Sequence, residues 1–195
     1  MLVSLDGSAP LRLDEVRVGV AYEDMRGDER RRVADLKRFR RVRLGESLAL
    51  VFETRDTIRA TLEEALRTER IEDPERVAGE IAAFNALIPA PGELTAALFL
   101  EVADPADLNA AVMRLDGIEK TLFLEVAGTR VRGVPDDVFA PGESALAHYV
   151  RFPLGPEQRE AIVSGSPIAT GTDHAACAVV VSLDEDQRRA IAEAL

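Results

Sequence analysis

Two histidines and a few carboxylates are the side chains of this sequence best suited to catalysis or metal binding. His148 lies within a predicted strand, and His174 follows Asp173 at a turn-like segment. If the two strands are neighbours, the imidazoles lie side by side, with carboxylates supplied by Glu53, Asp173 or Glu101. Imidazole and carboxylate together suit zinc, iron or manganese, and they also suit general acid–base catalysis without a metal. The alternative is a buried structural histidine and a second histidine in solvent.

A second polar group combines Glu53 with Arg55, Arg70 and Arg151. A carboxylate and guanidinium groups at the end of a strand can hold an anionic substrate, because arginine binds carboxylate and phosphate oxygens in pairs. The same residues can instead form a structural ion-pair network beneath a helix. Asn85, at the end of a predicted helix, can either cap that helix or contact a ligand.

The predicted site follows from these two groups. Its catalytic residues are His148, His174, Glu53, Arg55 and Arg151. Its metal ligands are His148, His174, Asp173 and Glu53, for a divalent transition metal such as zinc, iron or manganese. Arg70 and Asn85 are predicted to contact a cofactor.

The segment 47–57 must position Glu53 and Arg55. Both faces of residues 48–52 are apolar, which predicts a central strand covered on two sides. Thr54 can cap the helix that follows, so Glu53 and Arg55 lie where the core meets water.

Apolar periodicity and turn residues predict the remaining elements. Asp73-Pro74 is a helix start, and Ser182-x-x-Glu185 fits a capping box. Helices are predicted over 28–41, 55–70, 74–88, 105–116, 156–164 and 183–195. Strands are predicted over 94–102, 121–126, 130–134, 146–152, 167–172 and 178–181, with a loop over 135–143. The pattern predicts an α+β fold, with a mixed, mainly antiparallel sheet of about six or seven strands and about five helices. An N-terminal arm, 1–27, precedes a single domain, 28–195.

Composition excludes several classes of protein. The 195 residues are 47% apolar and 30% charged, with a net charge of −11, as expected of a soluble globular protein. No apolar run is long enough for a membrane span, and no secretion signal is visible, so we expect a cytoplasmic protein. The single cysteine, Cys177, excludes an internal disulfide. The acidic surface makes nucleic acid an unlikely partner.

Positive charge is concentrated in one segment. Residues 26–43 hold nine basic and three acidic residues, so this segment carries +6 and the rest of the chain −17. Lys37 and Lys120 are the only lysines. The arginines of the helix 28–43 can dock on an acidic partner protein, or on a second copy of the chain. They can also pair with the acidic body of the same chain, which the charge balance favours.

Several motifs resemble a bacterial family catalogued as a domain of unknown function, number 3501 in that series. The similarity covers residues 28–195. The sequences that carry it are Leu36-Lys37-Arg38, Val51-Phe52-Glu53-Thr54-Arg55-Asp56-Thr57, Arg67-Thr68-Glu69-Arg70-Ile71, Phe84-Asn85-Ala86-Leu87-Ile88-Pro89, Leu115-Asp116-Gly117-Ile118-Glu119, His148-Tyr149-Val150-Arg151-Phe152 and Asp173-His174. Two departures are Thr54, where the family has asparagine, and the replacement of a proline and an aromatic residue by Ala175 and Cys177.

The resemblance implies no established activity. The chain is similar to proteins that are often encoded beside rubrerythrin-like and iron–sulfur proteins. This resemblance implies an association with redox or oxidative-stress chemistry. The matching motif residues are Glu53, Arg55, Arg70, Asn85, His148, Arg151, Asp173 and His174. Two hypotheses therefore stand: a metal-binding or small-molecule-binding enzyme or accessory protein with a site built from these residues, and a non-catalytic protein that docks through helix 28–43.

Overall fold

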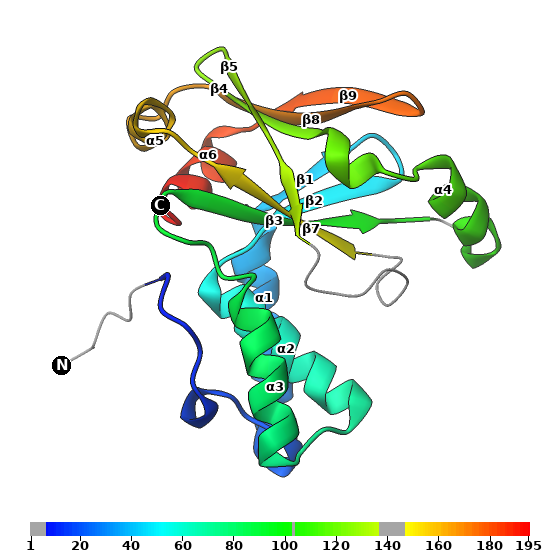
Figure 1. Cartoon of the computed structure of the whole chain (residues 1–195), viewed down its shortest axis with the longest axis vertical. Coiled ribbons are helices and arrows are strands. Elements are labelled where there is room, and N and C mark those ends of the chain that lie inside the picture. The colour runs from blue at the N-terminus through cyan, green and yellow to red at the C-terminus, as the bar shows by residue number, and fades with distance from the viewer. Residues whose placement is uncertain (1–6, 103, 137–146) are drawn as a thin grey trace.

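The structure, a computed structural model, describes residues 7–102, 104–136 and 147–195. Within these residues, nine strands form two antiparallel sheets, and six α-helices accompany them (Figure 1). The predicted α+β class, in a single domain with mainly antiparallel pairing, is confirmed. The strands divide between two sheets, where the sequence analysis expected one.

Sheet A has five strands, and the apolar segment singled out from the sequence is its second strand, an interior one rather than the central one. The strand order is β1 (Arg41–Leu44), β2 (Leu48–Phe52), β3 (Glu93–Leu100), β7 (Ala147–Pro153) and β6 (Val134–Asp136). All five residues of β2 are buried, as expected for a strand covered on both faces. Glu53 leaves this strand at the sheet end where β1 and β3 begin.

Sheet B has four strands and lies across one face of sheet A (Figure 1). The strand order is β5 (Thr129–Arg132), β4 (Leu122–Val126), β8 (Ile168–His174) and β9 (Cys177–Ser182). The predicted hairpins around Ala127-Gly128 and after Asp173 are both present. Gly171 allows β8 to pack closely, because a Cβ atom there would lie 2.1 Å from the carbonyl oxygen of Val179.

The larger hydrophobic core lies between the two sheets. Leu50, Phe52 and Val150 of sheet A pack there with Leu124 and Ile168 of sheet B. Two short helices, α5 (Pro156–Val163) and α6 (Glu185–Ala192), contribute to the same core, and α4 (Leu108–Arg114) precedes sheet B. Three single-turn 3₁₀ helices complete the described elements: Leu13–Glu15, Pro105–Asp107 and Ile118–Thr121.

Three helices cover the opposite face of sheet A: α1 (Gly19–Arg38), α2 (Arg55–Glu69) and α3 (Pro74–Asn85) (Figure 1). Helices α2 and α3 pack on this face through a second core that includes Ala97 and Tyr149 of the sheet. The predicted caps are confirmed, since Thr54 accepts the Thr57 N–H and Asp73 accepts the Arg76 N–H. Residues 53 and 54 therefore join β2 directly to α2.

Three predicted boundaries need correction. The arginine-rich helix runs from Gly19 to Arg38, because its first turns pack on α2 and bury Tyr22. The helix was expected over 28–41, but Arg41–Leu44 is instead a strand paired with β2. The capping box of α6 uses Asp184 with Gln187. Most of the predicted loop 135–143, and residue 146, lie outside the described residues.

Candidate functional site

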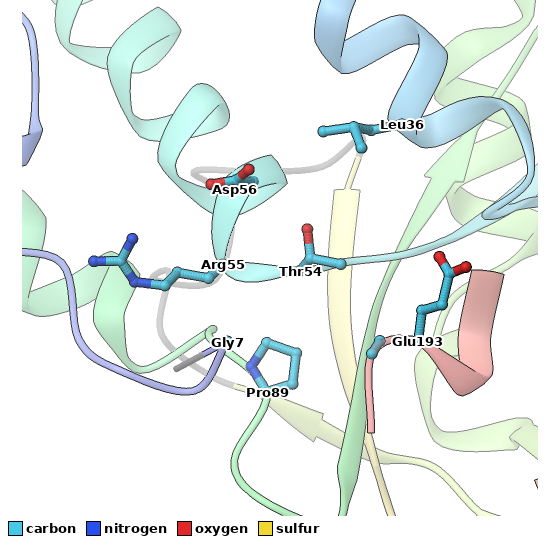
Figure 2. Close-up of a pocket in the computed structure, with 8 residues that line it drawn as sticks. Gly7, Leu36, Thr54, Arg55, Asp56, Pro89 and Glu193 are labelled. Atoms are coloured by element: carbon cyan, nitrogen blue, oxygen red, sulfur yellow. The ribbon is translucent and has the colours of Figure 1, made fainter. Parts of the chain in front are cut away.

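The junction between β2 and α2 opens into a pocket of about 360 Å³. We call it the elbow pocket. Figure 2 shows its walls, which come from five separate parts of the chain. They are Gly7 of the N-terminal arm, Leu36 of α1, Thr54, Arg55 and Asp56 at the start of α2, Pro89 after α3, and Glu193 and Ala194 after α6. Segments distant in sequence therefore converge where the motif containing Glu53 was found.

Polar atoms without a hydrogen-bond partner gather at this end of sheet A. Within the described chain, four buried side-chain atoms lack a partner: Arg40 Nη1, Glu53 Oε2, Glu93 Oε2 and Thr95 Oγ1. Strand pairing brings three of these residues together, since the Phe52 N–H donates to the Arg40 carbonyl and the Glu53 N–H donates to that of Thr95. Buried polar atoms are normally paired, so each of these four atoms has unused hydrogen-bonding capacity.

Glu53 is the most deeply buried of the predicted site residues. Its side chain has no exposed area, and its Oε1 accepts a hydrogen bond from Lys37 Nζ at 3.2 Å. Its Oε2 has no partner. Glu53 directly precedes Thr54, a wall of the elbow pocket. The Oε2 atom of Glu53 therefore keeps an unused capacity to accept a hydrogen bond.

Arg40 supplies a positive charge beside the same pocket. Burial lowers the pKa of its guanidinium, although the carboxylates of Glu193 and Glu53 act in the opposite direction. Glu193 lines the elbow pocket, so Arg40 lies within the electrostatic reach of this wall. Buried charges are costly unless they are paired and hydrogen-bonded, and one nitrogen of Arg40 is neither.

Arg55 and Asn85 hold the N-terminal arm. Arg55 Nε donates to the carbonyl of Ala9 at 2.7 Å, and its Nη2 donates to both Glu15 oxygens at 2.8 Å. The hydrogen bond from Arg55 lowers the pKa of Glu15. The Asn85 amide makes a pair of hydrogen bonds with the backbone of Leu11. Figure 2 shows the Arg55 guanidinium turned away from Thr54 and Glu193.

Arg151 and Arg70 lie apart from the elbow pocket walls. Arg151 makes an ion pair with Asp136 and donates to the carbonyl of Ala86 at 2.7 Å. Arg70 ends α2 in the left-handed conformation, with φ at 56°, and its side chain is exposed. Arg70 lines a separate pocket of about 370 Å³ together with Gly19 and Glu72.

The structure does not bring the two histidines and Glu53 around one hollow. His148 lies opposite Leu98 on the face of sheet A that packs on sheet B, whereas Glu53 lies on the helix-covered face. His174 ends β8 in sheet B, where its ring contacts the carbonyl of Asp116 and the N–H of Ala176. Asp173 pairs with Arg132, which lowers the pKa of that carboxyl group.

The predicted metal ligands are consequently dispersed. No three His, Cys, Asp or Glu residues in the described parts of the chain are grouped so that they could hold a metal ion. The geometry therefore gives no support to the set of His148, His174, Asp173 and Glu53 as one metal centre.

The arginines of α1 mostly find partners within the chain. Arg26 pairs with Glu64 at 2.8 Å, and Arg32 pairs with Glu29 at 2.7 Å and with Asp56 at 2.9 Å. Arg17, from the arm, pairs with the fully buried Glu63 at 2.9 Å. The arginine-rich helix is thus bound to α2 by ion pairs, the arrangement that the charge balance favoured.

The polar residues that sequence reasoning missed are Lys37, Arg40, Glu93 and Thr95. Lys37 was identifiable as one of only two lysines in an arginine-rich chain. Glu93 and Thr95 lie at the start of β3, and no local sequence signal indicates that polar atoms of their side chains are buried. Arg40 was taken as one of several surface arginines, but only 7% of it is exposed.

Taken together, the fold and the pocket define an α+β protein with a partly polar pocket at the junction of β2 and α2. The chain belongs to the family described as "Protein of unknown function (DUF3501)", which matches residues 10–195. The resemblance stated from the sequence is thereby confirmed.

A solved structure from Burkholderia pseudomallei K96243, described as a novel protein of unknown function, is similar over nearly the whole chain. The two share 30% identity, with a TM-score of 0.87, and the match covers 96% of this chain and 100% of the other. No curated protein matches the sequence. None of the described helices is long and apolar enough to cross a membrane.

Proposed function

We propose that this protein binds a small polar molecule in the elbow pocket, with Glu53 and Arg40 as its principal contacts. The observation that carries the proposal is the unpartnered Oε2 of Glu53, a side chain with no exposed area. Glu53 directly precedes Thr54, which lines the cavity of about 360 Å³. A ligand that donates a hydrogen bond here removes the cost of burying an unsatisfied carboxylate oxygen.

The charges around the pocket narrow the class of ligand. Glu193 lines the pocket and Glu53 directly precedes Thr54 in its wall, and both offer carboxylate oxygens. Arg40, whose charge interacts with both carboxylates, offers a nitrogen donor. The ligand therefore carries an amino or other N–H donor as well as an oxygen acceptor. Small zwitterions and amino-amides have both groups. Cavities of this volume commonly hold small ligands with a few fixed polar contacts.

A thermal-shift screen with amino acids, small amines and small carboxylates tests the proposal. A ligand that binds only the folded protein raises Tm with concentration. We expect zwitterions or amines to raise Tm in the wild-type protein, and we expect Glu193→Trp to remove the effect by filling the pocket. Glu185→Trp, on the exposed side of α6, is the matched control. A wild-type protein that responds to no compound, or a response that persists in Glu193→Trp, contradicts the proposal.

The metal-binding form of the hypothesis stays a prediction with its own test. Elemental analysis of the purified protein should reveal stoichiometric zinc, iron or manganese if His148 and His174 contribute to a metal site in solution. The metal content should then fall in His148→Ala and in His174→Ala. Protein without stoichiometric metal leaves only the small-molecule form of the hypothesis, for which the Glu53 oxygen is the supporting observation.

Docking through the arginine-rich helix is the alternative function. Two arginines of the basic segment 26–43 are unsuitable for testing it, because Arg40 is buried and Arg41 pairs with Glu101. Arg38 and Arg43 are exposed and make no ion pair with any described residue. Loss of a salt-sensitive complex on reversing the charge of Arg38 and Arg43 would support this alternative.

A further inference from the structure

A second cavity, of about 390 Å³, lies between α1, α2 and the end of β3. We call it the interhelix cavity, and it shares no wall residue with the elbow pocket. Its apolar walls are Tyr22, Val33 and Ala34 of α1, Ala60 of α2 and Phe99 of β3. The proposed polar site at the β2–α2 junction makes no use of this space.

The acidic side chains around the interhelix cavity are neutralised by arginines. Glu29 accepts hydrogen bonds from Arg32 at 2.7 Å and 3.2 Å, which lower its pKa against the effect of burial. Glu64 pairs with Arg26 at 2.8 Å and with Arg67 at 3.1 Å. Neither carboxylate is left to repel an anion at the cavity.

The cationic side chains are not balanced in the same way. Arg30 lines the cavity, and no described residue forms an ion pair with it. Lys37, two turns further along the same face of α1, also lines the cavity and shares its charge with Glu53. The cavity therefore combines apolar walls with one unneutralised guanidinium group.

We propose that the interhelix cavity binds a small carboxylate with an apolar body, whose carboxylate pairs with Arg30. Guanidinium and carboxylate groups form paired, charge-assisted hydrogen bonds, which favour this head group over a neutral one. The body of the ligand lies between Val33, Ala34 and Phe99, where it removes apolar surface from water. The volume falls within the range of cavities that hold small ligands.

Isothermal titration of the full-length protein with decanoate, 2-naphthoate and decanol tests the proposal. We expect the carboxylates to bind with a stoichiometry of one molecule per chain. Decanol should bind at least about tenfold more weakly than decanoate, because it lacks the charge-assisted hydrogen bonds to Arg30. Arg30→Gln should weaken carboxylate binding by about tenfold or more. Arg31→Gln is the matched control, because Arg31 lies on the same helix, pairs with Asp28 and does not line the cavity.

A second pair of variants tests the apolar walls. Ala34→Trp fills the cavity from an exposed position of α1 and should abolish binding, whereas Ala21→Trp, also exposed on α1, should not. Failure of both carboxylates to bind overturns the proposal. Equal effects of Arg30→Gln and Arg31→Gln, or binding that survives Ala34→Trp, also overturn it. These variants leave the elbow pocket intact, so the two proposed sites can fail independently.

Discussion

Lys37 of α1 and Glu53, the residue that follows β2, form a largely buried ion pair. Only 25% of the Lys37 side chain is exposed, and none of Glu53. Lys37 lines the interhelix cavity, while Glu53 precedes a wall of the elbow pocket. The pair is incomplete, since one Glu53 oxygen has no partner. A buried pair of this kind contributes little net stability, but removing one member leaves a costly uncompensated charge.

Replacement of Lys37 by methionine should therefore destabilise the protein strongly. We expect a loss of about 2–4 kcal/mol in the free energy of unfolding, because Glu53 then remains buried without its cation. The double variant Lys37→Met/Glu53→Leu should recover most of this loss. Urea denaturation measures all three values. Lys120→Met is the control, since 74% of that side chain is exposed, and a loss as small as the control's contradicts the assignment.

Arg70 combines a family motif with an unfavourable backbone conformation. Its φ of 56° is one that glycine adopts more easily at the end of a helix. If Arg70 serves only to end α2, Arg70→Gly should raise the free energy of unfolding by about 0.5–1 kcal/mol. Arg67→Gly, in the interior of α2, should lower it. Destabilisation by Arg70→Gly would show that the arginine side chain itself contributes contacts, in line with its predicted binding role.

At the scale of elements, the N-terminal arm is held to the helices by hydrogen bonds from two motif residues. Arg55 binds the arm at Ala9 and Glu15, and Asn85 binds it at Leu11. Leu11 is itself buried in the core beneath α2 and α3. Arg55 and Asn85, both predicted as site residues, therefore have a structural role in attaching the arm. The arm also contributes Gly7 to the wall of the elbow pocket.

Removal of either contact should release the arm without unfolding the sheets. We expect Asn85→Ala to cost about 1–3 kcal/mol in arm attachment, because the Leu11 backbone groups then lose their partner. Hydrogen exchange measured by mass spectrometry should show faster exchange over residues 9–18. Arg12→Ala is the control, since 68% of its side chain is exposed. Unchanged exchange in both Asn85→Ala and Arg55→Ala would contradict this role.

At the scale of the whole molecule, ion pairs attach the arm and α1 to α2. The pKa values of Glu15 and Glu29 lie below the ordinary value of 4.5, because Arg55 and Arg32 donate hydrogen bonds to them. A carboxylate whose pKa is lower in the folded protein stabilises that state at pH values above its unfolded pKa. This stability is lost as the pH falls through the folded pKa.

Stability should therefore decline when the pH is lowered from roughly 6 to roughly 3. The decline begins near the unfolded pKa and continues through the lowered folded values. Glu29→Gln should reduce Tm at neutral pH and make Tm less dependent on pH, because a carboxyl group that binds its proton differently in the folded and unfolded states is removed. Asp28→Asn, at an exposed neighbouring position, is the control and should retain the wild-type slope. Tm values from scanning calorimetry across the pH series provide the measurement, and an unaltered slope in Glu29→Gln contradicts the linkage.

Much of the fold was predictable from local patterns. The apolar run 48–52 predicted a central strand, Thr54 and Asp73 predicted helix starts, and the turn at Ala127-Gly128 predicted a hairpin. Each of these signals depends on neighbours within a few residues, so no tertiary information is needed to interpret it. The division into two sheets was not predictable, because nothing local specifies which strands pair across long distances.

The sequence by itself determined the fold class and the helix caps at Thr54 and Asp73. Only the tertiary structure decided which charged side chains meet. In the folded protein, Glu29 and Glu63 form ion pairs with arginines, and Arg40 is buried. His148 and His174 lie in two different sheets. The physical reason is that strand periodicity and capping act along the chain, whereas burial and ion pairing arise where distant segments are brought together by packing.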